Sequence, residues 1–80
     1  MKKDNAKIIM SLIELYEPEM MLRVKDVEFS MGSILYNCEA HVYLRIHDMS
    51  GNLLYSFEGT EAIFDNAKVM IYNDLLKMEV

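Results

Sequence analysis

Cys38, His41 and His47 are the side chains of this sequence best suited by type to nucleophilic catalysis or metal binding. A cysteine nucleophile needs a histidine beside it to accept its proton. The run from residue 38 to residue 48 alternates aliphatic and polar residues, which predicts a strand whose even-numbered residues face inward. Cys38 would then lie on the inner face and His41 on the outer face. We therefore do not expect them to form a catalytic pair.

Motifs for catalysis or metal binding are missing from the sequence. It contains no Gly-x-Ser-x-Gly elbow, no Cys-x-x-Cys pair, no glycine-rich phosphate loop and no His-Glu-x-x-His. Glu39 and His41 could share a cation on one strand face, but His47 would lie about 20 Å farther along the strand. Zinc normally takes at least three protein ligands. We expect a protein that is not an enzyme and that needs no metal or other cofactor.

Size and charge narrow the class of partner. The chain has 80 residues, a formal net charge of −5, 52% hydrophobic residues and a single cysteine. This composition is typical of one compact domain, residues 1–80, in a reducing cytoplasm. We read no signal peptide and no membrane segment of roughly 20 apolar residues. The acidity disfavours nucleic-acid phosphates and favours a basic protein partner, although it also suits solubility alone.

A first helix is expected over residues 4–16. Asp4 is a plausible N-cap, and apolar residues recur at helical spacing after it. Pro18 disfavours helical geometry in the residue before it, so the helix should end near Tyr16.

A second, longer helix is expected over residues 61–78. Thr60 can cap it, Glu61 suits the positive end of its dipole, and one broad apolar stripe runs along it. Asp74 falls inside that stripe, where an unpaired carboxylate would be costly. Either the helix end overhangs the sheet and leaves Asp74 in water, which is the simpler interpretation, or Asp74 pairs with a base.

Three strands are expected between the helices, over residues 20–31, 36–48 and 53–58. The first changes parity at Lys25-Asp26, which indicates a β-bulge or, alternatively, two short strands broken there. Gly32-Ser33 predicts a turn before the second strand. The turn formers from Asp48 to Asn52 predict a hairpin into the third strand. The predicted fold is a single α+β domain of order α-β-β-β-α, a three-stranded antiparallel meander with both helices on one face.

This order of elements is similar to that of the double-stranded-RNA-binding domain. The segment from Val42 through Leu76 resembles that domain's hairpin and the long helix that follows it. The family carries a lysine-rich cluster at the start of this helix, where the present chain has the acids Glu61 and Asp65. The resemblance therefore concerns the order of elements and speaks against RNA binding through this helix.

Three groups of residues are candidates for binding a protein. They are a row on the outer face of the central strand, an acidic group around the start of the last helix, and a seam at seven-residue spacing on that helix. The groups are, in that order, His41, Tyr43, Arg45 and His47; Glu58, Glu61 and Asp65; and Ala62, Val69 and Leu76. Each also has an ordinary interpretation as solvated surface.

The sequence thus favours a non-catalytic protein-interaction module. Small acidic proteins of this build include inhibitors from phages and other mobile elements that block nucleic-acid-handling enzymes such as CRISPR effectors, which is an analogy of class and not of motif. In that case the acidic group would meet a basic groove, and binding would weaken with salt. The alternative is a self-associating structural subunit, a homodimer built on the helix seam or on an open strand edge.

Overall fold

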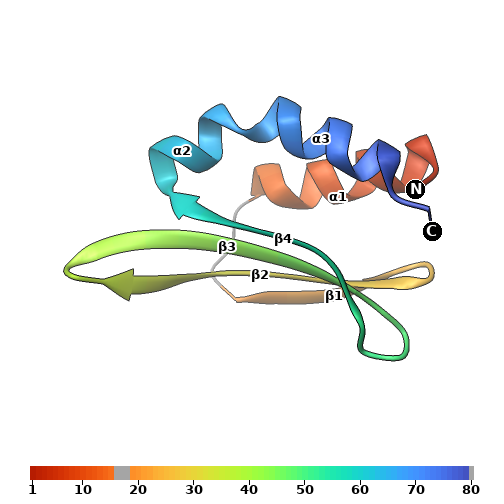
Figure 1. Cartoon of the computed structure of the whole chain (residues 1–80), viewed down its shortest axis with the longest axis horizontal. Coiled ribbons are helices and arrows are strands. Elements are labelled where there is room, and N and C mark those ends of the chain that lie inside the picture. Colours follow the sequence, from red (N-terminus) through yellow and green to blue (C-terminus); the bar gives the residue numbers. More distant parts are fainter. Residues whose placement is uncertain (16–18, 80) are drawn as a thin grey trace.

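The computed structural model describes residues 1–15 and 19–79. Its strands form one antiparallel sheet in the order β1-β2-β3-β4, and the helices lie on one face of that sheet (Figure 1). In chain order the elements are α1 (Lys3–Leu15), β1 (Met20–Val24), β2 (Val27–Tyr36), β3 (Glu39–Asp48), β4 (Leu53–Thr60), α2 (Glu61–Asn66) and α3 (Lys68–Lys77). The fold is α+β, as predicted, but the sheet has four strands and not three.

The predicted first strand is in fact a hairpin, β1 and β2. The chain reverses at Lys25, which has a φ of 53°, and Val24 pairs with Val27 across the turn. Residues equally distant from a two-residue turn face the same side of the sheet. The change of parity therefore marks a reversal, so the β-bulge interpretation is wrong and the alternative of two strands is confirmed.

The turn predicted at Gly32-Ser33 is also misplaced. β2 continues through both residues, and the chain reverses instead at Asn37 and Cys38, whose φ values are 49° and 65°. Gly32 has a different role, because a Cβ there would lie 2.7 Å from the Tyr43 hydroxyl oxygen. Cys38 is exposed in this turn and is not an inward-facing strand residue.

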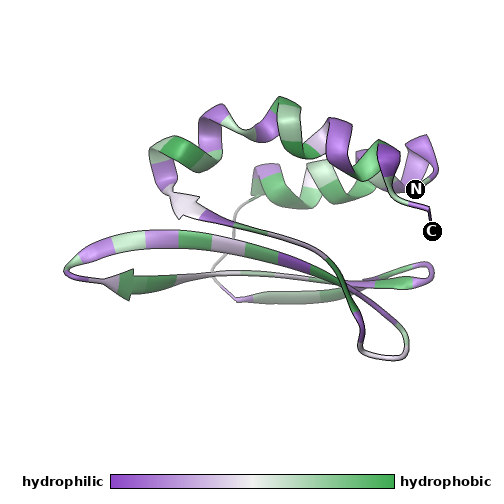
Figure 2. Cartoon of the chain, in the orientation of Figure 1, coloured by the Kyte–Doolittle hydropathy of each residue, from purple (hydrophilic) through white to green (hydrophobic). Residues whose placement is uncertain are grey.

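α1 begins one residue earlier than predicted, at Lys3, so Asp4 lies in its first turn and not at an N-cap. The predicted end near Tyr16 lies outside the described residues. Hydrophobic and hydrophilic residues alternate along β3 (Figure 2), as the sequence predicts for a strand with one buried face.

The core lies between the inner face of the sheet and the helices. α1 contributes Ala6, Ile9 and Ile13, and the C-terminal helices contribute Phe64, Ile71 and Leu75. The sheet contributes the remaining buried apolar side chains: Val24, Val27, Phe29, Met31, Val42, Leu44 and Ile46. These side chains form one cluster, which holds the helices on the sheet.

The single helix predicted over 61–78 is two helices, α2 and α3, separated at Ala67. Thr60 caps α2 as predicted, since its Oγ1 accepts the Ile63 N–H at 3.3 Å. At Ala67 the N–H bonds to the Phe64 carbonyl, three residues back, instead of continuing the α-helical pattern. Part of the expected apolar stripe faces outward, since Ile63 is 54% exposed and Met70 is 47% exposed.

Candidate functional site

A cleft opens where the C-terminal end of α1 meets α2 above β3. Its volume is about 230 Å³, and its apolar floor is formed by Ile13, Val42 and Phe64. Each of these floor residues belongs to a different element and to the hydrophobic core. The cleft is therefore a fixed feature of the packing between helices and sheet.

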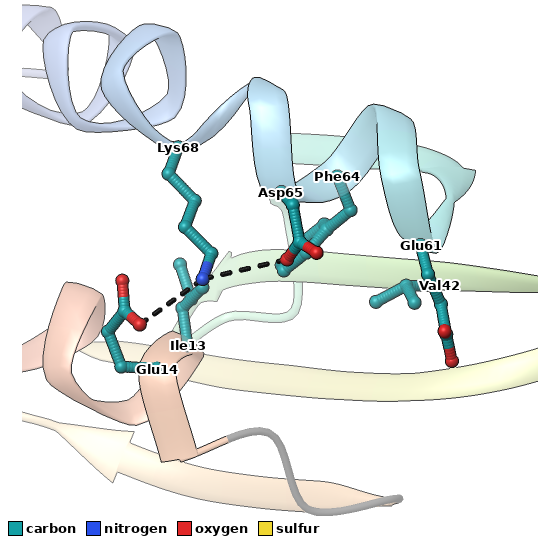
Figure 3. A pocket seen from close by; sticks show the side chains of 7 residues that line it. All are labelled: Ile13, Glu14, Val42, Glu61, Phe64, Asp65 and Lys68. Carbon is teal, nitrogen blue, oxygen red and sulfur yellow. Dashed lines mark hydrogen bonds and ion pairs between the residues drawn. The ribbon is translucent and has the colours of Figure 1, made fainter.

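Four charged side chains line the same cleft: Glu14, Glu61, Asp65 and Lys68. Lys68 lies between two of the acids, with its Nζ 3.2 Å from Glu14 Oε2 and 3.6 Å from Asp65 Oδ1 (Figure 3). Glu61 has no ion pair with any residue in 1–15 or 19–79, and it is exposed. Three carboxylates against one ammonium group leave this site, the acidic cleft, with excess negative charge.

The acidic cleft contains two of the three predicted acids. Glu61 and Asp65 lie on its rim, whereas Glu58 lies in β4 opposite Tyr43, on the outer face of the sheet. Its carboxylate is 4.0 Å from the His41 ring nitrogen. The structure therefore separates Glu58 from the other two by the thickness of the sheet.

The sequence did not identify Lys68 as a member of this site. Asp65 and Lys68 are three residues apart, a spacing at which helical side chains meet. Glu14 reaches Lys68 only because α1 and α3 pack together. No local sequence pattern predicts the contact between Glu14 and Lys68.

The predicted row on the central strand lies on the open face of the sheet, as its parity indicated. The Arg45 guanidinium lies over the Tyr43 ring, 4.5 Å from its centroid, and the rings of His41 and Tyr36 meet edge to face at 5.3 Å. His47 pairs with Glu28 in the β2–β3 ladder. Several of these side chains thus already contact one another, which limits the surface they offer to a partner.

The predicted seam on the last helix is divided between two helices. Ala62 lies in α2 beside a shallow pocket shared with Glu39, whereas Val69 lies in α3 beside a groove shared with α1. Leu76, near the end of α3, is 37% exposed. The break at Ala67 interrupts the seven-residue repeat on which the seam was predicted.

Asp74 has a partner that the sequence did not suggest. Its carboxylate accepts a 2.9 Å hydrogen bond from the Tyr55 hydroxyl of β4, in a partly buried position. Burial, together with this bond, raises the pKa of Tyr55 above its usual value. The predicted exposure of Asp74 and the alternative of a basic partner are both wrong.

Within residues 1–15 and 19–79, no group of three or more His, Cys, Asp or Glu side chains is placed to hold a metal ion. In the same part of the chain, no helix is both long enough and apolar enough to cross a bilayer.

Comparisons with protein-family models, with curated proteins and with solved structures give no significant match to this chain.

Proposed function

We propose that this chain is a non-catalytic protein-interaction module whose acidic cleft receives a basic side chain of a partner protein. The observation that carries the proposal is the placement of Glu14, Glu61 and Asp65 around one apolar-floored cleft that is lined by a single ammonium group. Such a site attracts cations and also offers apolar contact to the rest of a long side chain.

The dimensions of the cleft favour a side chain over a free substrate. Pockets that hold drug-sized ligands usually measure about 300–1,000 Å³, and this cleft measures about 230 Å³. An arginine would direct its guanidinium to Glu61, and its stem would contact only the few floor atoms that remain accessible, since Ile13 and Val42 are each 1% exposed. Glu61 is the suitable acceptor because Lys68 already pairs with the other two carboxylates.

A nucleic-acid-handling enzyme is the class of partner that we propose. Such enzymes line their binding grooves with lysine and arginine, which neutralise phosphates. This chain has a net charge of −5 and a cleft with excess carboxylates, so it complements a groove of that kind. Occupation of the groove by this chain would block the nucleic acid, and the function would then be inhibition.

A short arginine peptide provides the direct test. We would titrate isotope-labelled protein with hexa-arginine and follow the methyl resonances of Ile13 and Val42 by NMR. Glu61→Gln should raise the dissociation constant about tenfold, because a charge-assisted hydrogen bond contributes roughly 1.5–3 kcal/mol. Glu58→Gln is the matched control, since it removes the same charge from the opposite face of the sheet.

Equal weakening by both variants would show that only net charge attracts the peptide and would refute the site. Binding through the acidic cleft should also weaken as salt rises. The basic partner can then be sought by capture from a cell lysate at low salt, with a parallel high-salt wash. Glu61→Gln protein should lose that partner, whereas Glu58→Gln protein should retain it.

A further inference from the structure

β1 is an edge strand of the sheet and pairs with β2 alone. Val24 and Val27 close a two-residue turn, so hydrogen-bonded pairs recur at Val24, Leu22 and Met20 along β1. The N–H and C=O groups of the alternate residues, Met21 and Arg23, consequently point away from β2. An edge of this kind is a template for a further strand.

An apolar stripe of α1 runs beside this edge. Ile8, Leu12 and Leu15 recur at the spacing of one helix face, and α1 contacts β1. The groove toward α3 is lined by Lys7, Met10 and Ser11, so Ile8 and Leu12 lie toward the other flank, whereas Leu15 follows Ser11 by one helical turn and lies between the two flanks. Ile8 is 46% exposed and Leu15 is 67% exposed.

β1 adds a further apolar side chain to the same flank. Leu22 pairs with Phe29 and so faces the helix side of the sheet, but as an edge residue it remains 43% exposed. The flank thus combines unpaired backbone groups with exposed aliphatic side chains from both layers of the fold. An extended strand is a partner that can pair with such backbone groups, and an apolar helix above that strand would cover the aliphatic stripe.

We propose that a second copy of this chain covers the flank, with the two β1 strands antiparallel and the two α1 helices packed against each other. A two-fold axis at Leu22 sets Met21 of each copy opposite Arg23 of the other, so no like charges face across the strands. The same axis places Leu22 of one copy against Leu22 of the other. It also brings the apolar stripes of the two α1 helices together. The contact is isologous, and it closes at two copies.

The paired sheets would form one continuous eight-stranded sheet with helices on a single face. The surface involved is one short strand and one helix flank, so the contact falls near the small end of specific interfaces, at about 1,200 Å² or less. The association is accordingly weak and depends on protein concentration. This inference does not rest on the acidic cleft, which lies on the other side of α1, toward α2 and α3.

Sedimentation measurements from about 10 µM to about 1 mM test the proposal, because weak interfaces of this size populate dimers only at high concentration. Wild-type protein should move toward a dimer, and Ile8→Lys should raise the dissociation constant at least about tenfold, because it places an ammonium group in an apolar contact. Val69→Lys and Leu35→Lys are controls, since Val69 is 74% exposed in α3 and Leu35 is 71% exposed in β2.

Amide hydrogen exchange locates the contact at single residues. The N–H groups of Met21 and Arg23 should become protected as the protein concentration rises, whereas that of Leu22, already bonded to β2, should be protected throughout. A monomer at every concentration would overturn the proposal. Loss of the dimer in Val69→Lys or Leu35→Lys, but not in Ile8→Lys, would also overturn it and would assign the contact to α3 or to the β2–β3 hairpin.

Discussion

The hydrogen bond between Tyr55 and Asp74 joins β4 to α3, and its removal gives a quantitative test of how the sheet holds the last helix. Tyr55 Oη donates to Asp74 Oδ2 at 2.9 Å, and both residues are partly buried. Tyr55→Phe keeps the aromatic ring in place and deletes the donor. The carboxylate then loses this bond while it stays in a partly apolar environment.

The expected loss follows from the charge and the exposure of the pair. A hydrogen bond to a charged group contributes about 1.5–3 kcal/mol to stability. Because both groups keep some contact with water, we expect a loss of about 1.5 kcal/mol. For a domain of about 60–100 residues, 1 kcal/mol corresponds to about 4–8 °C in Tm, so Tm should fall by about 6–12 °C.

Thermal unfolding followed by circular dichroism measures the shift, and urea unfolding measures the free energy. Tyr36→Phe is the matched control, because it removes a hydroxyl from a tyrosine that is 51% exposed and should change stability by less than about 0.5 kcal/mol. In combination with Asp74→Asn, Tyr55→Phe should show a coupling energy on the order of 1 kcal/mol. A loss no larger than that of Tyr36→Phe would refute the reasoning.

The same pair predicts a loss of stability in alkali. The pKa of Tyr55 is raised in the folded protein, so the folded state keeps its phenol proton when the unfolded chain loses it. The contribution is complete below the unfolded value of 10.0 and is lost as pH rises above it. Between pH 9 and pH 11, the Tyr55→Phe variant should therefore lose less stability than the wild type. The difference in stability loss should correspond to the titration of one phenol group.

Three further changes test other contacts. Cys38→Gly should raise stability by about 1 kcal/mol in urea unfolding, because Cys38 has a φ of 65° and left-handed geometry costs L-residues roughly 1–2 kcal/mol. Hydrogen bonds from Asn52 lower the pKa of Asp48, so the stability that the ionised carboxylate contributes is lost as pH falls through that lowered pKa. The Tm of Asp48→Ala should therefore decrease less steeply below pH 4 than the Tm of the wild type. Phe64→Ala should lower the free energy of unfolding by about 3–5 kcal/mol, because the ring is 3% exposed.

The hydrophobic periodicity identified the elements whose two faces have different surroundings. β3 alternates because the helices cover one of its faces and water covers the other, and α1 shows its buried stripe for the same reason. Turn positions were harder to predict. Asn37-Cys38 lacks the glycine that usually marks such a turn, and Gly32 lies mid-strand beneath Tyr43.

The candidate site could be predicted in part. Glu61 and Asp65 were recognised because they are close in sequence at the start of one helix, and Glu58 was grouped with them for the same reason. The alternation of side chains along β4 places Glu58 on the open face of the sheet, beside His41 and away from the helices. Glu14 joins the site from the far end of the chain through Lys68, a contact that depends on helix packing.

The sequence by itself determined the α+β class, the net negative charge and the inward-facing residues Val42, Leu44 and Ile46 of β3, because each follows from local periodicity or from composition. Only the tertiary structure decided the break at Ala67, the pairing of Asp74 with Tyr55, the placement of three carboxylates around one cleft and the exposed flank of β1 and α1. These features join residues that are distant in the sequence. Their geometry is set by how the helices pack on the sheet, and no local pattern encodes that packing.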